Sequence, residues 1–158
     1  MAEVILQRVG EATILTIDRP SAHNAISRSV MDELDAALTE VAGSDTRALA
    51  IRGAGERVFV SGGDLKDLAA VRTEADALAM AQRMRDLLDR VAGLPIPVLG
   101  ALNGHVIGGG GEVAIACDFR LAADDIRAPW EAVAEMERRR AEAKSGSRAE
   151  PPTPTTTD

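Results

Sequence analysis

The chain has 158 residues, of which 46% are hydrophobic and 27% are charged, and its formal net charge is −7. This length and balance predict one globular domain with a real core, and the acidic charge argues against nucleic acid as a partner. The single cysteine, Cys117, excludes an internal disulfide, no apolar run is long enough to span a membrane, and the N-terminus does not resemble a signal peptide, so we expect a cytoplasmic protein.

The first third of the chain alternates between strand patterns and a helix pattern. Residues 4–9 and 12–18 are rich in β-branched side chains around a Gly-Glu pair and predict an antiparallel hairpin. Residues 27–41 carry apolar side chains at helical spacing, with Ser27 as the N-cap. A second apolar strand is expected at residues 48–53. This order predicts the α/β class.

A glycine turn and a long helix are predicted next. Asp64 follows Gly62 and Gly63 and is expected to cap a helix. Residues 73–94 predict a long helix that ends before Pro95, with methionines that fill the core. Its apolar stripe is expected to contain Leu78, Ala81, Met84, Leu87, Leu88 and Val91.

The stretch at residues 97–124 is the most informative part of the chain. Residues 97–102 predict a buried strand, four glycines follow at 108–111, and residues 112–118 predict a buried helix. Backbone N–H groups at such a helix start suit a bound anion or an oxyanion formed during a reaction. Glu112 lies three residues after Gly109 and shares its helix face. The same glycines also suit close packing of the helix, and the spacing does not separate the two interpretations.

Three segments together resemble the crotonase family, the enoyl-CoA hydratases and isomerases. They are DRPSAHNAIS at 18–27, RVFVSGGDLKDLAA at 57–70 and the stretch at 97–124, in the family's order. The first carries Arg19, Pro20, Asn24 and Ala25 as the family does. The resemblance covers residues 4–124 and implies a crotonase-like ββα spiral that is incomplete, because roughly the second half of the usual fold has no counterpart here.

The resemblance also implies a site for an acyl-CoA thioester, with no metal and no cofactor apart from the coenzyme A of the substrate itself. In it, the N–H groups of Gly63 and Gly109 form an oxyanion hole and Glu112 acts as general acid/base. The substrate-binding residues implied by the resemblance are Ala22, Asn24, Ala25, Gly62, Asp64, Leu65, Lys66 and Gly108. Residues 18–27 are also typical of a plain strand-to-helix turn, and a solvated Lys66 is the alternative to one that faces a CoA phosphate.

The resemblance ends after Asp124. Residues 125–144 predict a charged helical segment, and residues 145–158, rich in Pro and Thr, predict a disordered tail. The hydratases of the family hold a water between two carboxylates, and the second would fall on Ala132, which carries none. Glu131 stands one position away and is left without an assigned role.

Three interpretations of function remain open at the level of sequence. The chain is a lyase or isomerase of fatty-acyl or aromatic-acid metabolism, or a truncated, non-catalytic half-domain that joins other copies or an intact relative, or a remnant without a selected function. A dinucleotide site is not supported, because the G-x-G-x-x-G spacing and its following acid are absent. The Gly-Lys-Ser/Thr of a phosphate-binding loop is absent as well.

Overall fold

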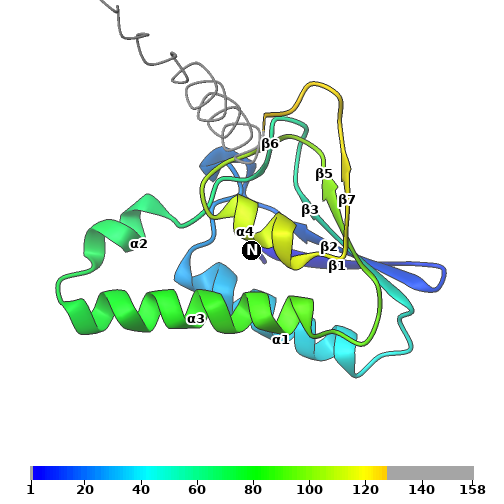
Figure 1. Ribbon diagram of the computed structural model, residues 1–158, viewed down its shortest axis with the longest axis horizontal. Coiled ribbons are helices and arrows are strands. Elements are labelled where there is room, and N and C mark those ends of the chain that lie inside the picture. Colours follow the sequence, from blue (N-terminus) through cyan, green and yellow to red (C-terminus); the bar gives the residue numbers. More distant parts are fainter. Residues whose placement is uncertain (1, 128–158) are drawn as a thin grey trace, which may run out of the picture.

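The computed structural model describes residues 2–127, and a five-stranded sheet is its centre (Figure 1). The sheet order is β1-β2-β3-β5-β7. Its strands are β1 (Val4–Val9), β2 (Ala12–Ile17), β3 (Ala48–Gly53), β5 (Val98–Leu102) and β7 (Phe119–Ala122). The first two strands form the predicted antiparallel hairpin, and the others pair in parallel. Two further short strands, β4 (Val58–Val60) and β6 (His105–Val106), pair in parallel as a separate sheet.

Four α-helices connect these strands, and a 3-10 turn, η1 (Pro20–Ala22), follows β2. The helices are α1 (Arg28–Ala42), α2 (Leu65–Ala70), α3 (Glu74–Ala92) and α4 (Gly110–Ala116). Helix α3 packs against both α1 and α4 on one side of the sheet (Figure 1). The predicted cap at Ser27 is confirmed, because its hydroxyl accepts a hydrogen bond from the backbone N–H of Val30 at 3.2 Å. The predicted cap at Asp64 is confirmed by a 2.8 Å bond from the N–H of Lys66.

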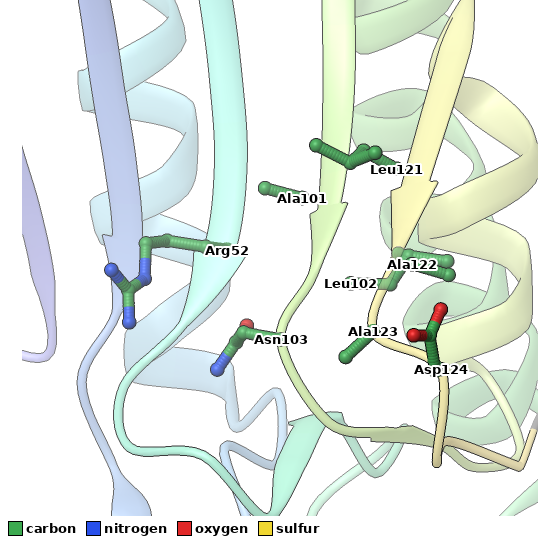
Figure 2. A pocket seen from close by; sticks show the side chains of 8 residues that line it. All are labelled: Arg52, Ala101, Leu102, Asn103, Leu121, Ala122, Ala123 and Asp124. Atoms are coloured by element: carbon green, nitrogen blue, oxygen red, sulfur yellow. The ribbon is translucent and has the colours of Figure 1, made fainter.

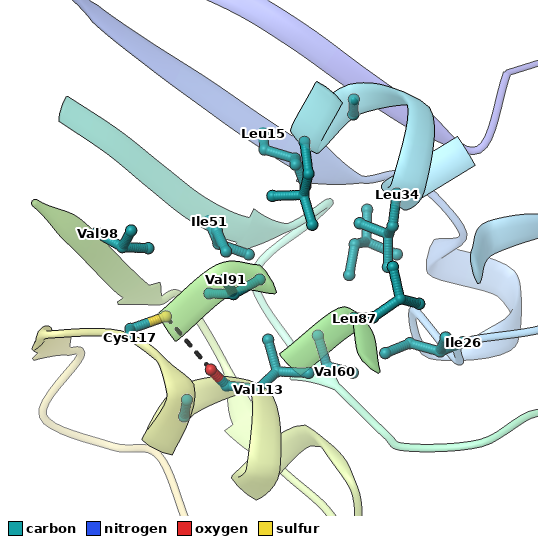
Figure 3. Close-up of a cluster of buried hydrophobic side chains, with 14 of the residues drawn as sticks. Leu15, Ile26, Leu34, Ile51, Val60, Leu87, Val91, Val98, Val113 and Cys117 are labelled. Atoms are coloured by element: carbon teal, nitrogen blue, oxygen red, sulfur yellow. Dashed lines mark hydrogen bonds between the residues drawn. The ribbon is translucent and has the colours of Figure 1, made fainter. Parts of the chain in front are cut away.

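The core lies between the sheet and these helices (Figure 3). Strands β2, β3 and β5 alternate buried and half-buried residues, so one face of each points into the core. Leu15, Ile51 and Val98 come from the sheet, and Leu34 and Leu87 come from α1 and α3. Aromatic residues make up 2% of the chain, and the described core is mostly aliphatic, with Met31, Cys117 and the fully buried Phe59 among its other members.

Two helix predictions need correction. The N-terminal part of α3 is exposed, with Leu78 at 63%, and the helix buries only Leu87 and Val91 fully. The predicted stripe is therefore wrong at this end, because α3 extends past α1 toward α2 (Figure 1). Helix α4 begins two residues earlier than expected. It buries Gly110, Gly111, Val113 and Ala114 but leaves Ile115 68% exposed, so the predicted burial is confirmed for one face of the helix only.

Some expectations fall on residues that the structure does not describe. The predicted charged helix at 125–144 lies outside the described residues from position 128 on, and so do Glu131 and the predicted disordered tail at 145–158. Within residues 2–127, no helix combines the length and the apolar character needed to cross a membrane.

Candidate active site

The candidate site forms where two glycine-containing loops leave a pair of parallel strands. Strand β4 pairs with β6 through Val58 with His105 and Val60 with Val106. The backbone N–H of Ile107 then donates to the carbonyl of Val60 at 3.1 Å. Because the strands run in parallel, the loops that follow them emerge at the same end. Residues 62–63 and 108–109 are thereby brought together from positions 46 residues apart in the sequence.

Glycine is required at two positions for this close approach. Gly62 has a φ of +95°, which side-chain-bearing residues rarely adopt, and a Cβ on it would lie 2.7 Å from the nitrogen of Gly109. A Cβ on Gly110 would lie 2.0 Å from the carbonyl oxygen of Val60. Both contacts are shorter than any real Cβ makes with backbone atoms. The packing interpretation of the glycine run is therefore correct for Gly110. This packing role does not conflict with a chemical role for the neighbouring glycines.

The backbone N–H groups of Gly63 and Gly109 are close to one another. A Cβ built on Gly109 would lie 3.9 Å from the nitrogen of Gly63. Since a residue's own nitrogen lies about 2.5 Å from its Cβ by covalent geometry, the two nitrogens are at most about 6.4 Å apart. Within residues 2–127, neither N–H donates a hydrogen bond to another residue. Two donors that have no partner among residues 2–127 are thus close together.

Gly63, Gly109 and Glu112 line the same pocket, which has a volume of about 390 Å³. Glu112 stands in the first turn of α4 and is exposed. Its carboxylate makes neither an ion pair nor a hydrogen bond with any other residue between positions 2 and 127. The arrangement therefore combines two N–H donors and one carboxylate at a shared opening, all three without a partner in the described part of the chain.

The rest of the pocket wall is largely apolar and comes from three helices and the loop before α1. The side chains that contribute to it are Ile26, Met31, Leu68, Val71, Ala77, Met80, Ala81 and Met84. Met80 and Met84 were expected only to fill the core. They do pack against it, but they are half-buried and also face the pocket. The sequence carries a signal for this role, because residues 77, 80, 81 and 84 continue toward the N-terminus the face of α3 that buries Leu87 and Val91.

The side chain of Asn24 is used inside the protein. It is 1% exposed and has a φ of 54°. Its amide oxygen accepts from the N–H of Arg19 at 3.0 Å, and its amide nitrogen donates to the carbonyls of Ala54 and Val58 at 3.0 and 2.8 Å. Asn24 therefore ties the loop after β2 to the start of β4 and the turn before it, and it is not among the residues that line the pocket.

Asp64 lines the pocket but is held by other groups. Its carboxylate caps α2 through the N–H of Lys66 and accepts from the guanidinium of Arg19 at 2.9 Å. The pKa of Asp64 is lowered, first by the backbone hydrogen bond from Lys66 and second by the side-chain hydrogen bond from Arg19. A carboxylate stabilised in this way is a weak proton acceptor, so of the two acids that line the described pocket, Glu112 is the one free to exchange a proton.

The remaining predicted binding residues lie around the pocket and do not line it. Leu65 is 80% exposed at the start of α2, and Lys66 beside it is exposed too. Ala22 is half-buried in η1, and Ala25 is 7% exposed with its carbonyl bonded to Arg19 at 2.7 Å. Gly62 is buried and packs against the backbone of Gly109. Gly108 is exposed with a φ of +50°.

Two other hollows do not contain the predicted catalytic residues. Figure 2 shows one of about 600 Å³ at the ends of β3, β5 and β7, with Arg52 and Asp124 on its walls. The amide of Asn103 in this hollow is bonded to the backbone of Gly53 and Gly55. The second hollow is lined by both histidines of the chain. Among the described residues, no group of three or more His, Cys, Asp or Glu side chains is placed to hold a metal ion.

Comparison with known proteins identifies relatives of this arrangement. A sequence model of the family described as enoyl-CoA hydratase/isomerase matches residues 10–132. The short-chain-enoyl-CoA hydratase of Clostridium acetobutylicum is 34% identical over 125 residues, which cover 78% of this chain and 48% of that protein. The enoyl-CoA isomerase/hydratase fer4 of Mycosarcoma maydis is 39% identical over 121 residues, which cover 71% of this chain and 43% of that protein.

The solved structures agree with this match. The crystal structure of enoyl-CoA hydratase from Bacillus anthracis superposes with a TM-score of 0.76 at 30% identity, covering 84% of this chain and 53% of that one. The enoyl-CoA hydratase structure from Mycobacterium smegmatis has a TM-score of 0.78 at 25% identity and covers 85% and 53%. The chain therefore spans about half the length of the relatives that it matches.

Proposed function

Because the chain belongs to the crotonase, or enoyl-CoA hydratase/isomerase, family, we propose that it binds an acyl-CoA thioester and promotes proton transfer next to the thioester carbonyl. The observation that carries this proposal is the shared pocket of Gly63, Gly109 and Glu112, with two unpaired N–H groups less than about 6.4 Å apart. No cofactor is required beyond the coenzyme A of the substrate.

The two backbone donors are suited to the charge that develops on a thioester. When a proton leaves the carbon next to the carbonyl, the electron pair of the broken C–H bond moves into an enolate and the negative charge collects on the carbonyl oxygen. Two N–H groups about 2.9 Å from that oxygen stabilise this charge, and each such donor contributes about 3–4 kcal/mol to the transition state. Gly63 and Gly109 supply these donors in our proposal.

Glu112 is proposed as the group that receives and returns the proton. With one available carboxylate, the proton taken from the α carbon of a 3-enoyl thioester is returned to the γ carbon, which moves the double bond into conjugation with the carbonyl. Hydration instead needs a water held by two acceptors, and Asp64 is engaged by Arg19 and the start of α2. The described pocket thus favours isomerisation over hydration. The apolar wall formed by Met31, Met80 and their neighbours suits a fatty-acyl chain.

A reaction in heavy water tests this proposal. We expect the purified chain to convert 3-hexenoyl-CoA to the conjugated isomer with deuterium incorporated from D₂O, and to hydrate 2-hexenoyl-CoA poorly. Glu112→Gln should lower the isomerisation rate by about 10²- to 10⁴-fold. The control is Glu74→Gln, which changes an exposed glutamate at the start of α3, away from the pocket. Equal rates in the two variants would contradict the role of Glu112.

A pair of substitutions at Gly109 tests the donor. Its φ of −61° is one that proline adopts, so Gly109→Pro removes the N–H while keeping the backbone angle. Gly109→Ala brings the same Cβ to within 3.3 Å of the Cα of Gly62 but keeps the N–H. We expect Gly109→Pro to lose the isomerase activity and Gly109→Ala to retain most of it. Equal loss in both would show that crowding, and not the missing donor, is responsible.

A second candidate function is that of a non-catalytic half-domain that associates with a crotonase relative or with another copy. The exposure of Ile115, Phe119 and Leu121, at 68%, 62% and 68%, favours this candidate, because it leaves apolar side chains of α4 and β7 uncovered by residues 2–127. No turnover of either thioester, together with co-purification of an intact relative, would support it over the enzyme.

A further inference from the structure

The orientation of the Gly63 N–H is set from the opposite side of its own peptide group. This peptide joins Gly62 to Gly63, and its carbonyl, that of Gly62, accepts a hydrogen bond from the N–H of Ile26 at 2.7 Å. A trans peptide is planar, so its C=O and N–H point in opposite directions. The bond from Ile26 therefore directs the Gly63 N–H away from Ile26.

Residues 25–26 and 62–64 form a short parallel bridge around this peptide. Ile26 pairs with Gly63, and the N–H of Asp64 returns a bond to the carbonyl of Ile26 at 3.1 Å. The bridge stands outside every strand of both sheets, so no neighbouring ladder supports it. A contact outside the bridge is therefore needed to hold the two segments in this alignment.

Arg19 supplies a connection between both sides of the bridge. One guanidinium nitrogen, Nη1, donates to the carbonyl of Ala25 at 2.7 Å and to the carboxylate of Asp64 at 2.9 Å. Its Nε pairs with Glu3 at 2.6 Å. The side chains of Arg19 and Asp64 are 17% and 12% exposed, so water competes little with these contacts. One side chain thus holds the residue before Ile26 and the residue after Gly63 at a set distance.

We propose that Arg19 is a positioning residue, which acts through Ala25 and Asp64 to hold the Gly62–Gly63 peptide with its N–H directed at the pocket. The effect of Arg19 on catalysis rests on the proposed function, in which the Gly63 N–H donates a hydrogen bond to the thioester carbonyl. Arg19 is not among the residues that line the pocket. Lysine does not reproduce these contacts, since its ammonium ends one bond short of the position of Nη1 and it has no nitrogen at the position of Nε to keep the pair with Glu3.

The first test observes the Gly63 amide without any ligand. Labelling with ¹⁵N-glycine limits the NMR spectrum to the 14 glycines of the chain. We expect Arg19→Lys to shift the Gly63 amide resonance, because the orientation of the Gly62–Gly63 peptide changes. The matched control is Arg8→Lys, because Arg8 also joins a backbone carbonyl, that of Gly10, to a carboxylate, that of Asp45, but does so between the hairpin and the loop before β3. This control should leave the Gly63 resonance unchanged.

The second test observes the carbonyl of a bound ligand. The infrared C=O stretch of hexanoyl-CoA, labelled with ¹³C at the carbonyl, moves to lower frequency when the oxygen accepts hydrogen bonds. At saturating ligand, we expect the wild-type chain and Arg8→Lys to show this downshift and Arg19→Lys to lose most of it. If Arg19→Lys fails to fold, Asp64→Asn takes its place, since it keeps an oxygen for the Lys66 N–H but removes the charge that faces Arg19.

The two readouts separate the inference from the function on which it rests. If the Gly63 amide and the downshift are unchanged in Arg19→Lys while its melting temperature falls as in Arg8→Lys, Arg19 stabilises the fold only and the inference is wrong. If the wild-type chain shows no downshift but the Gly63 amide still responds to Arg19→Lys, the hold of Arg19 on the peptide is supported and the proposed function is wrong.

Discussion

The centre of the sheet and its last strand differ in what covers them. In β3 and β5, residues alternate between buried and half-buried, and Leu49, Val98 and Leu102 are at most 1% exposed. In β7, which pairs with β5, all four residues are exposed, including Phe119 at 62% and Leu121 at 68%. Parallel strands are usually covered on both faces, and β7 is an exception within residues 2–127.

The difference shows that apolar composition does not by itself produce a core. The sequences of β5 and β7, VLGAL and FRLA, both contain large apolar residues. Only β5 has helices over one face and a strand on each side. A buried side chain gains free energy in proportion to the apolar area removed from water, so equal residues contribute unequally in the two strands. Three changes test this contrast.

The largest difference in the free energy of unfolding is expected between substitutions at the two phenylalanines of the chain. Phe59, in β4, is 0% exposed, whereas Phe119 is 62% exposed. We expect Phe59→Ala to lower the free energy of unfolding by about 3–5 kcal/mol, because it removes buried contacts and leaves a cavity. Phe119→Ala should change it by less than about 0.5 kcal/mol. Urea unfolding of both variants measures this, and similar losses would contradict the contrast.

An intermediate effect on stability, which depends on pH, is expected from Cys117, which lies between α4 and β7. Its thiol is 3% exposed and donates to the carbonyl of Val113 at 3.3 Å (Figure 3). Burial raises the pKa of Cys117 from 9.0 to about 11. The folded state resists losing this proton. The stabilisation contributed by the buried thiol is therefore fully present below pH 9.0 and is lost as the pH rises through about 11. The shift corresponds to about 2–3 kcal/mol.

Thermal unfolding between pH 8 and pH 11 measures this loss. The chain has no tyrosine and two lysines, so few other side chains titrate in this range. The control is Cys117→Ala, whose melting temperature should be lower at pH 8 but should depend less on pH than that of the wild type. An equally steep dependence in this variant would show that the thiol is not the group responsible.

The smallest effect on stability is expected from a double substitution in β7. Phe119→Ser with Leu121→Ser removes two exposed apolar side chains, and we expect the free energy of unfolding to change by less than about 1 kcal/mol in total. Self-association, measured by sedimentation velocity, should decrease, because exposed edge strands pair with other chains. A loss of several kcal/mol instead would show that residues beyond 127 cover β7 in the intact chain.

The local features of the fold were predictable from the sequence. The hairpin at residues 4–17, the helix after Ser27 and the cap at Asp64 each depend on residues within a few positions of one another. The glycine run and Glu112 were recognisable for the same reason, since their spacing along one turn specifies a shared helix face. Short-range hydrogen bonds and turn angles are encoded by the residues that make them.

Other features depended on the tertiary structure alone. The pairing of β4 with β6 places Gly63 beside Gly109. These strands have three and two residues, which is too short for a sequence pattern that would predict their pairing. The same holds for the amide of Asn24, which joins Ala54 and Val58, and for Arg19, which connects Ala25 to Asp64. Apart from the bond of Arg19 to Ala25, these contacts join residues 30 to 47 positions apart. Their geometry follows from how the sheet and helices pack, because local sequence specifies a donor or an acceptor but not which distant partner will reach it.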